Sequence, residues 1–213
     1  PKGVELVVEE LEHMKEIRVN GTPIALTSTG KWIDVCFEKL AIPDQVWKEG
    51  ANEIDIDFDY YKTSGLEAVY LLGDFGVVLT PGEGTDIPVL NSLPEKLHIG
   101  DISLQGLPFY SGKVTYLMDQ LFAEDEELVV EVESFGGSLV KLIGAEENML
   151  AFPPLKGKVN GLKAVEVVLT RRNTFGPLHQ YPKLSSSYGP GNFMTEGDAW
   201  KEEYQLLEQG LLK

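Results

Sequence analysis

The chain has 213 residues, 43% of them hydrophobic, so it can bury a sizeable core as one large β-domain or two small ones. Its 34 acidic residues outnumber 18 basic ones. The formal net charge of −16 argues against nucleic acid and anionic membranes as partners, because binding either depends on clustered Lys and Arg. No apolar run approaches the roughly 18 residues that cross a bilayer, so we expect a soluble chain.

A strand, turn, strand, loop, strand unit occurs twice along the chain. The first copy runs from Val4 to Asp57 as VELVVEE, EIRVNG, a Trp32-Ile33-Asp34 step and KEGANEIDID. The second runs from Leu128 to Leu169 as LVVEVE, LVKLIG, a Phe152-Pro153-Pro154 step and KGKVNGLKAVEVVL. A duplicated unit of this kind predicts two related β-sandwiches.

Period-two patterns dominate the predicted elements. Ile54, Ile56 and Phe58 alternate with acidic residues, which predicts a half-buried antiparallel strand. Further strands are predicted within 66–79, 113–122, 127–133 and 163–171, which are rich in β-branched and aromatic residues. Helical signals are poor: Leu40–Trp47 is at most a short turn, and Glu196–Gly210 fits one helix or a final strand. We therefore predict an all-β protein with antiparallel sandwiches.

A domain boundary is predicted where prolines and glycines interrupt the chain between Thr80 and Lys96. We assign residues 1–80 to a first β-sandwich-like unit, 81–96 to a linker or crossing loop, and 97–213 to a second sandwich. Residues 97–122 supply lead-in strands for the second copy, and nothing equivalent precedes the first. This asymmetry indicates that the first unit is truncated at its N-terminus. The one cysteine, Cys36, is expected to be a small buried hydrophobe in the run WIDVCF.

Several motifs resemble a known family. GLPFYSGKVTY at Gly106–Tyr116, the Pro153-Pro154 step and RRNTFGPLH at Arg171–His179 resemble the galactose-binding-like jelly rolls of large bacterial glycoside hydrolases, above all α-L-rhamnosidase-like enzymes. The second turn departs from the family pattern, with LIGAEE in place of valine-asparagine-glycine. The resemblance implies an accessory domain whose partners are a carbohydrate and the catalytic domain of the same polypeptide. The catalytic carboxylates would lie on that separate barrel.

The residues themselves indicate no catalytic machinery, so we expect this fragment not to be an enzyme. There is no G-x-S-x-G motif, and His13, His98 and His179 lie too far apart for a zinc-site spacing. A strand separates Asp55, Asp57 and Asp59 by about 7 Å, too far to converge on one calcium ion without a bend. We expect no cofactor, and a structural calcium ion with ligands from loops stays open as an alternative.

A bound sugar would require aromatic faces and polar groups that bond to adjacent hydroxyls. Loop residues of these types form the candidate site: Phe109, Tyr110, Arg171, Arg172, Asn173, His179, Tyr181, Tyr188 and Trp200. The structural alternative is that Phe109 and Tyr110 pack in the core or at a sheet edge and that Asn173 fixes a turn. Three functions follow: a carbohydrate-binding module, a sandwich that only packs on the catalytic domain, and an independent glycosidase.

Overall fold

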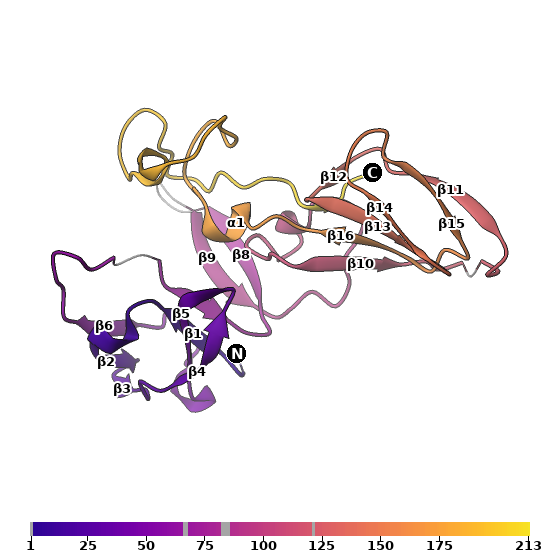
Figure 1. The fold of residues 1–213 in the computed structure, drawn as a ribbon. Coiled ribbons are helices and arrows are strands. Elements are labelled where there is room, and N and C mark those ends of the chain that lie inside the picture. The colour runs from indigo at the N-terminus through magenta and orange to yellow at the C-terminus, as the bar shows by residue number, and fades with distance from the viewer. Residues whose placement is uncertain (1, 66–67, 82–85, 121) are drawn as a thin grey trace. The chain divides into compact units, whose positions relative to one another are not determined.

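The computed structural model describes residues 2–65, 68–81, 86–120 and 122–213, and these form an all-β protein. The chain divides into two compact units, residues 1–75 and 76–213, which are coloured indigo to violet and magenta to yellow in Figure 1. Each unit has its own hydrophobic core. The predicted all-β class with antiparallel, sandwich-like sheets is confirmed.

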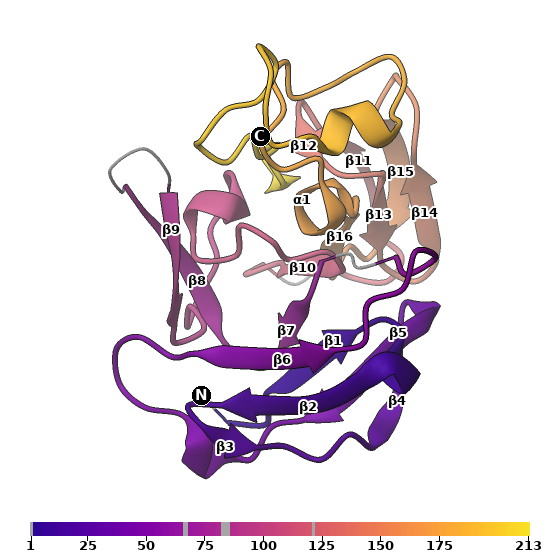
Figure 2. The same cartoon turned by 90° about the vertical axis from the view of Figure 1, so that its left-hand side faces the viewer.

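Unit 1 consists of two antiparallel sheets, which Figure 2 shows as separate layers. One sheet has the strand order β4-β5-β1-β7 and the other β3-β2-β6. The elements are β1 (Glu5–Val8), η1 (Leu11–His13), β2 (Met14–Val19), β3 (Thr22–Pro23), β4 (Ser28–Trp32), β5 (Asp34–Ala41), η2 (Asp44–Val46), β6 (Ile54–Phe58) and β7 (Tyr70–Leu72).

The core of unit 1 lies between these sheets. Its fully buried members include Leu6, Ile17 and Leu40, and Ile54, Ile56 and Phe58 of β6 pack against them. The alternation predicted for β6 is therefore confirmed, since Asp55 and Asp57 are exposed. The β2–β3 hairpin turns at Asn20 and Gly21, which have φ of 51° and 79°. This is the left-handed backbone that an Asn-Gly turn favours.

Unit 2 contains a four-stranded sheet of order β10-β16-β13-β14 and three two-stranded sheets, β11-β15, β12-β17 and β8-β9. The elements are β8 (Gly76–Pro81), β9 (Asp86–Asn91), η3 (Ile102–Leu104), β10 (Lys113–Leu117), β11 (Glu127–Glu131), β12 (Phe135–Gly136), β13 (Leu139–Ile143), β14 (Glu147–Leu150), β15 (Lys156–Asn160), β16 (Ala164–Val168), α1 (Arg172–Phe175), η4 (Pro190–Phe193) and β17 (Gly210–Leu211). Val140, Leu142 and Val167 are fully buried in its core.

The two units share one pattern of strand pairing. In unit 1, β1 pairs with β5, and β2 pairs with both β3 and β6. In unit 2, β11 pairs with β15, and β13 pairs with both β14 and β16, all antiparallel and in the same order along the chain. Unit 2 adds β10 beside β16. The pairing order agrees with the repeat seen in the sequence.

Three local features differ from expectation. The predicted strand within 66–79 is broken at Gly73 and Asp74 into β7 of unit 1 and β8 of unit 2. Of the expected linker at 81–96, residues 86–91 form β9 of the β8–β9 hairpin, and residues 82–85 lie outside the described residues. Pro88 is tolerated in β9 because no described strand pairs with the other edge of β9. The segment Glu196–Gly210 is neither a helix nor a strand until β17 begins at Gly210.

Cys36 is exposed, so the prediction that it is a buried hydrophobe is wrong. The reason lies in the register of β5. Strand β1 covers β5 only from Glu38 to Ala41, and the earlier residues of β5 extend past β1 in the β4–β5 hairpin. In this part of β5 the described partner strand is β4, and Val35 and Cys36 are exposed.

Candidate functional site

Four aromatic side chains of unit 2 form a connected group, which we call the aromatic cluster: Phe109, His179, Trp200 and Tyr204. The Tyr204 ring centroid lies 5.1 Å from that of Phe109 and 4.6 Å from that of His179. The rings of His179 and Trp200 stack at 5.9 Å with an interplanar angle of 29°. The structure thus brings together three predicted site residues around Tyr204, which was not predicted.

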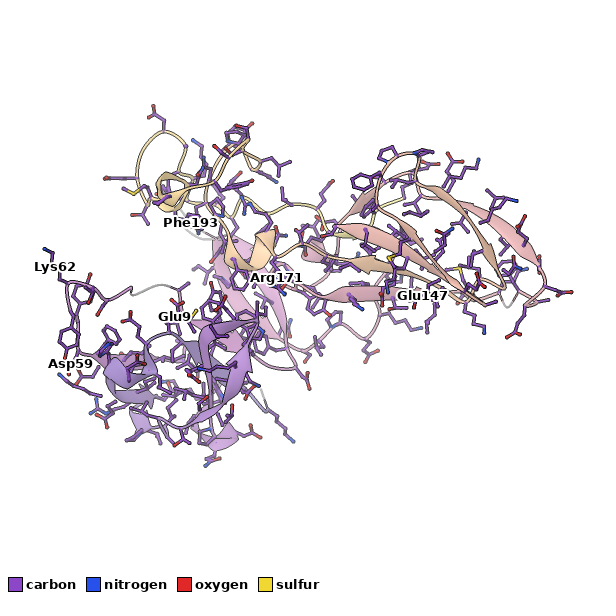
Figure 3. All side chains as sticks on the ribbon, in the orientation of Figure 1. Glu9, Asp59, Lys62, Glu147, Arg171 and Phe193 are labelled. Carbon is purple, nitrogen blue, oxygen red and sulfur yellow. The ribbon has the colours of Figure 1, made fainter. Side chains whose placement is uncertain are left out.

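Backbone hydrogen bonds join the two ends of the long loop between Tyr181 and Trp200. The Tyr181 N–H donates to the Ala199 C=O at 2.7 Å, and the Lys201 N–H donates to the His179 C=O at 2.7 Å. The His179 Nδ1 lies 3.0 Å from the Lys201 carbonyl oxygen. Its two ends therefore lie next to each other, and the stacked rings of His179 and Trp200 lie at this base of the loop. Figure 3 labels Phe193 on this gold loop.

A cleft of about 490 Å³ lies in unit 2 beside the aromatic cluster, and Tyr204 is part of its wall. The other lining residues are Val77, Val78, Leu79, Asp101, Ser103, Leu104, Gly106, Lys183, Leu206 and Glu208. They comprise five aliphatic side chains, two carboxylates, one ammonium group, one hydroxyl and one glycine. The cleft therefore offers apolar and charged surface together.

The carboxylate of Asp101 is tied to the protein. One oxygen accepts from the Ser103 N–H at 2.9 Å and from the Gln209 N–H at 3.0 Å, and the other accepts from the Ser103 hydroxyl at 2.8 Å. Asp101 thereby caps η3 and holds the C-terminal segment. In the described part of the chain, the charged ends of Lys183 and Glu208 have no ion-pair or hydrogen-bond partner. These two groups are free to meet a ligand.

Arg172 and Tyr188 form a second contact next to the cleft. The guanidinium carbon of Arg172 lies 5.9 Å from the Tyr188 ring centroid, and Arg172 Nη2 donates to the Lys183 carbonyl at 3.0 Å. The Ser185 N–H, which donates to the Tyr188 hydroxyl, lowers the pKa of Tyr188, and Arg172 lowers it further. The hydrogen bond from Arg172 to the Lys183 C=O positions the backbone of Lys183.

None of the nine predicted site residues is part of the cleft lining. Four of them also lie outside the aromatic cluster and the Arg172–Tyr188 contact: Tyr110, Arg171, Asn173 and Tyr181. Asn173 is fully buried, and its amide donates to the Leu207 C=O and accepts from the Leu207 N–H, both at 2.8 Å. It therefore fixes the chain, which was the structural alternative, rather than meeting a surface ligand. Arg171 and Tyr181 are exposed, and Figure 3 labels Arg171 next to α1. The hydroxyl of exposed Tyr110 donates to the Lys113 C=O at 3.2 Å.

All eleven lining residues were missed by sequence reasoning, including the four with charged or aromatic side chains: Asp101, Lys183, Tyr204 and Glu208. Tyr204 and Glu208 belong to WKEEYQLLEQ, whose acidic residues suggest a solvated face. The available signal was Tyr204 itself, an aromatic residue close to Trp200. Asp101 and Lys183 carry no local pattern, because their proximity depends on the tertiary fold.

Among residues 2–65, 68–81, 86–120 and 122–213, no group of three or more His, Cys, Asp or Glu side chains is arranged to hold a metal ion. Of the three aspartates weighed for calcium, Asp59 forms an ion pair with Lys15, and Asp55 lies opposite Arg18 on β2. No helix in these ranges has the length and apolarity needed to cross a membrane.

The chain was compared with protein-family models, curated proteins and solved structures, and none of the three comparisons gives a match.

Proposed function

We propose that this chain is a non-catalytic accessory module that binds a carbohydrate in the cleft of unit 2. One observation carries the proposal: the cleft combines an aromatic wall, aliphatic surface and two charged side chains without protein partners. Its volume of about 490 Å³ is that of a small-ligand site. A saccharide of one or two rings suits such a space.

The chemistry of a sugar ring matches the lining of the cleft. The C–H face of a pyranose is apolar and packs on an aromatic ring, here Tyr204. Its hydroxyl groups donate to a carboxylate such as Glu208 and accept from an ammonium group such as Lys183. The phenol of Tyr204 is held from behind by Phe109 and His179, so the wall is preorganised.

The sequence resemblance supports the same function. Phe109 lies in the motif Gly106–Tyr116, and His179 ends the motif Arg171–His179. Both motifs resemble accessory jelly rolls of glycoside hydrolases, and both supply rings that contact Tyr204. On this proposal the partner is the catalytic domain of a glycoside hydrolase in the same polypeptide. Of the two carboxylates in the cleft, Asp101 is engaged by three protein donors, so we expect the chain not to hydrolyse glycosides.

Calorimetric titration of the whole chain with neutral glycans tests the proposal, guided by a glycan array that includes rhamnose, galactose and N-acetylated sugars. We expect binding that Tyr204→Ala weakens at least tenfold and that Tyr60→Ala, an exposed tyrosine of unit 1, leaves unchanged. A folded chain that binds no glycan on the array would overturn the proposal. Hydrolysis of aryl glycosides by the chain would overturn its non-catalytic part.

A second candidate is a sandwich that only packs on the catalytic domain. One face of the β8–β9 hairpin supports it, because Val78 pairs with Val89 and Thr80 with Ile87, which places their side chains on one face. Val78, Ile87 and Val89 are 44%, 54% and 47% exposed. Such a patch suits a protein partner. This candidate predicts a folded chain that binds no glycan and whose association with the catalytic domain weakens when Val78 and Val89 are replaced by Ser.

A further inference from the structure

The cleft runs along one edge of β8. Three consecutive residues of this strand, Val77, Val78 and Leu79, line it. Consecutive side chains of a strand point to opposite faces, so a cleft that meets all three lies along the backbone edge. Among the described strands, β8 pairs with β9 alone, on its other edge. The cleft is therefore bordered by a backbone edge of β8 that no described strand covers, with Gly106 hydrogen-bonded to its start at Val77.

The direction of the backbone groups follows from the hairpin register. The Val77 N–H donates to the Gly106 C=O at 2.8 Å, so it points away from β9 and toward a residue that also lines the cleft. In an antiparallel ladder the outward and inward orientations alternate. Val78 therefore faces Val89 as a hydrogen-bonded pair, and the N–H and C=O of Leu79 point to the same side as those of Val77.

Pro88 agrees with this assignment independently. It lies directly opposite Leu79 in the register. Proline has no N–H, and at a hydrogen-bonded position of the ladder it would leave the partner carbonyl unpaired. At the alternate position no hydrogen bond is required of it. The Leu79 N–H and C=O therefore face the cleft, whose lining includes five aliphatic side chains.

We propose that the ligand of this cleft carries an acetamido group, as an N-acetylhexosamine does; this inference rests on the proposed carbohydrate function. The acetamido carbonyl accepts a hydrogen bond from the Leu79 N–H, as the carbonyl of an added strand would. The trans amide directs its own N–H away from β8, and Asp101 and Glu208 are acceptors in the remaining lining.

The aliphatic lining suits the rest of the acetyl group. Leu104 is 86% exposed, and Leu206 lines the same cleft. An acetyl methyl group placed against these side chains removes its own apolar surface and that of Leu104 and Leu206 from water. A hexose without the acetamido group offers a hydroxyl at that position, which cannot cover Leu104. The cleft is therefore expected to distinguish the two sugars.

The experiment compares two disaccharides that differ only at this group. N,N′-diacetylchitobiose carries acetamido groups where cellobiose carries hydroxyls. In calorimetric titrations of the whole chain, we expect diacetylchitobiose to bind at least tenfold more tightly. Leu79→Pro removes the N–H at an edge position that tolerates proline, and we expect it to abolish this preference. Leu79→Val keeps the N–H, and we expect it to retain the preference. Thermal unfolding checks that both variants fold.

The outcomes separate this inference from the proposed function. Equal affinity for both disaccharides, lost in Tyr204→Ala, would overturn the acetamido assignment and leave carbohydrate binding in place. If Leu79→Val also lost the preference for diacetylchitobiose, the preference would depend on the Leu79 side chain, which would contradict the role of the Leu79 N–H. Binding of no glycan at all would overturn both. If the chain bound an alternating Lys-Val peptide and neither disaccharide, the edge of β8 would be a site for an added peptide strand, and both proposals would be overturned.

Discussion

At the scale of single residues, the thiol of Cys36 is governed by two carboxylates. Its Sγ donates to Asp34 Oδ1 at 3.1 Å, and this hydrogen bond, with a further contribution from Glu9, raises the pKa of Cys36 to about 11 from its ordinary 9.0. A raised pKa favours the neutral thiol, so near pH 8 the reactive thiolate is roughly a hundredfold rarer than in an ordinary cysteine. Cys36 is exposed yet expected to react slowly.

Replacing the carboxylate should reverse this effect. In Asp34→Asn the thiolate loses its main repulsive neighbour, so the pKa of Cys36 falls, and we expect alkylation by iodoacetamide at pH 8 to be about tenfold faster. Asp57→Asn, which changes an exposed carboxylate on β6, is the matched control and should leave the rate unchanged. Equal rates in the native chain and Asp34→Asn would contradict the assignment of the raised pKa to Asp34.

Gln209 is the other residue with an unusual environment. It is 1% exposed, and neither atom of its side-chain amide has a hydrogen-bond partner within the described residues. An unpaired buried polar group costs about 1–3 kcal/mol. We therefore expect Gln209→Met, which is similar in length and apolar, to raise the free energy of unfolding by about 1 kcal/mol, measured by urea denaturation.

Gln105 provides the opposite case in the same unit. Its amide accepts from the His98 N–H and donates to the His98 and Asp101 carbonyls, at 2.8, 3.1 and 3.3 Å. Gln105→Met loses these bonds, so it should lower the free energy of unfolding by about 1 kcal/mol or more. If both glutamine variants destabilised the protein equally, Gln209 would have a partner that the present contacts do not reveal.

At the scale of elements, Asn173 of α1 holds the extended segment 204–209. Its amide satisfies both backbone groups of Leu207, whose neighbours Leu206 and Glu208 line the cleft. Asn173→Ala leaves those groups unpaired, and we expect a loss of about 1–3 kcal/mol in the free energy of unfolding. Asn173→Asp keeps the acceptor but places a buried carboxylate against the Leu207 C=O, so we expect it to destabilise the protein at least as much as Asn173→Ala.

Hydrogen exchange distinguishes a local effect from a global one. If Asn173 fixes this segment, exchange of the Leu207 amide should accelerate in Asn173→Ala more than exchange of the β13 and β16 amides. Weaker glycan binding should accompany it, because the segment carries Tyr204 and Glu208. Uniform acceleration across unit 2 would show instead that Asn173 supports the whole core.

The elements also show which parts of the fold follow from sequence. Strand β6 was predictable because the alternation of Ile54, Ile56 and Phe58 with acidic residues is a local pattern. The repeat was predictable for the same reason. The break between β7 and β8 was not, since residues 68–79 are apolar on both sides of Gly73 and only tertiary packing assigns the two strands to different units.

The candidate site was predictable only in part, because ring types can be counted in a sequence and contacts cannot. Phe109, His179 and Trp200 were predicted as sugar-binding candidates, and the structure places them in one group of rings. Tyr204, which joins Phe109 to His179 in that group, belongs to an acidic run and was not predicted. Asn173 was chosen as a polar surface group, and its amide is instead used internally by Leu207. A polar side chain near a predicted loop has no local signal that separates these roles.

At the scale of the whole molecule, the chain has two hydrophobic cores with no residue in common. The strands around the two cores pair in the same order along the chain. Leu6 belongs to one and Leu142 to the other, and both are fully buried. Replacing either by Ala removes a buried side chain and leaves a cavity, with an expected cost of about 2–5 kcal/mol. We expect Leu6→Ala to destabilise unit 1 and Leu142→Ala to destabilise unit 2.

Hydrogen exchange measured segment by segment tests whether the two cores unfold as separate cooperative units. In Leu6→Ala, protection should fall in β1, β2 and β5 and persist in β13 and β16, and Leu142→Ala should give the reverse. Leu117→Ala, at a side chain that is 78% exposed, is the control and should change stability by less than about 0.5 kcal/mol. Loss of protection in both units from one core substitution would mean that the duplicated sandwiches fold as a single cooperative structure.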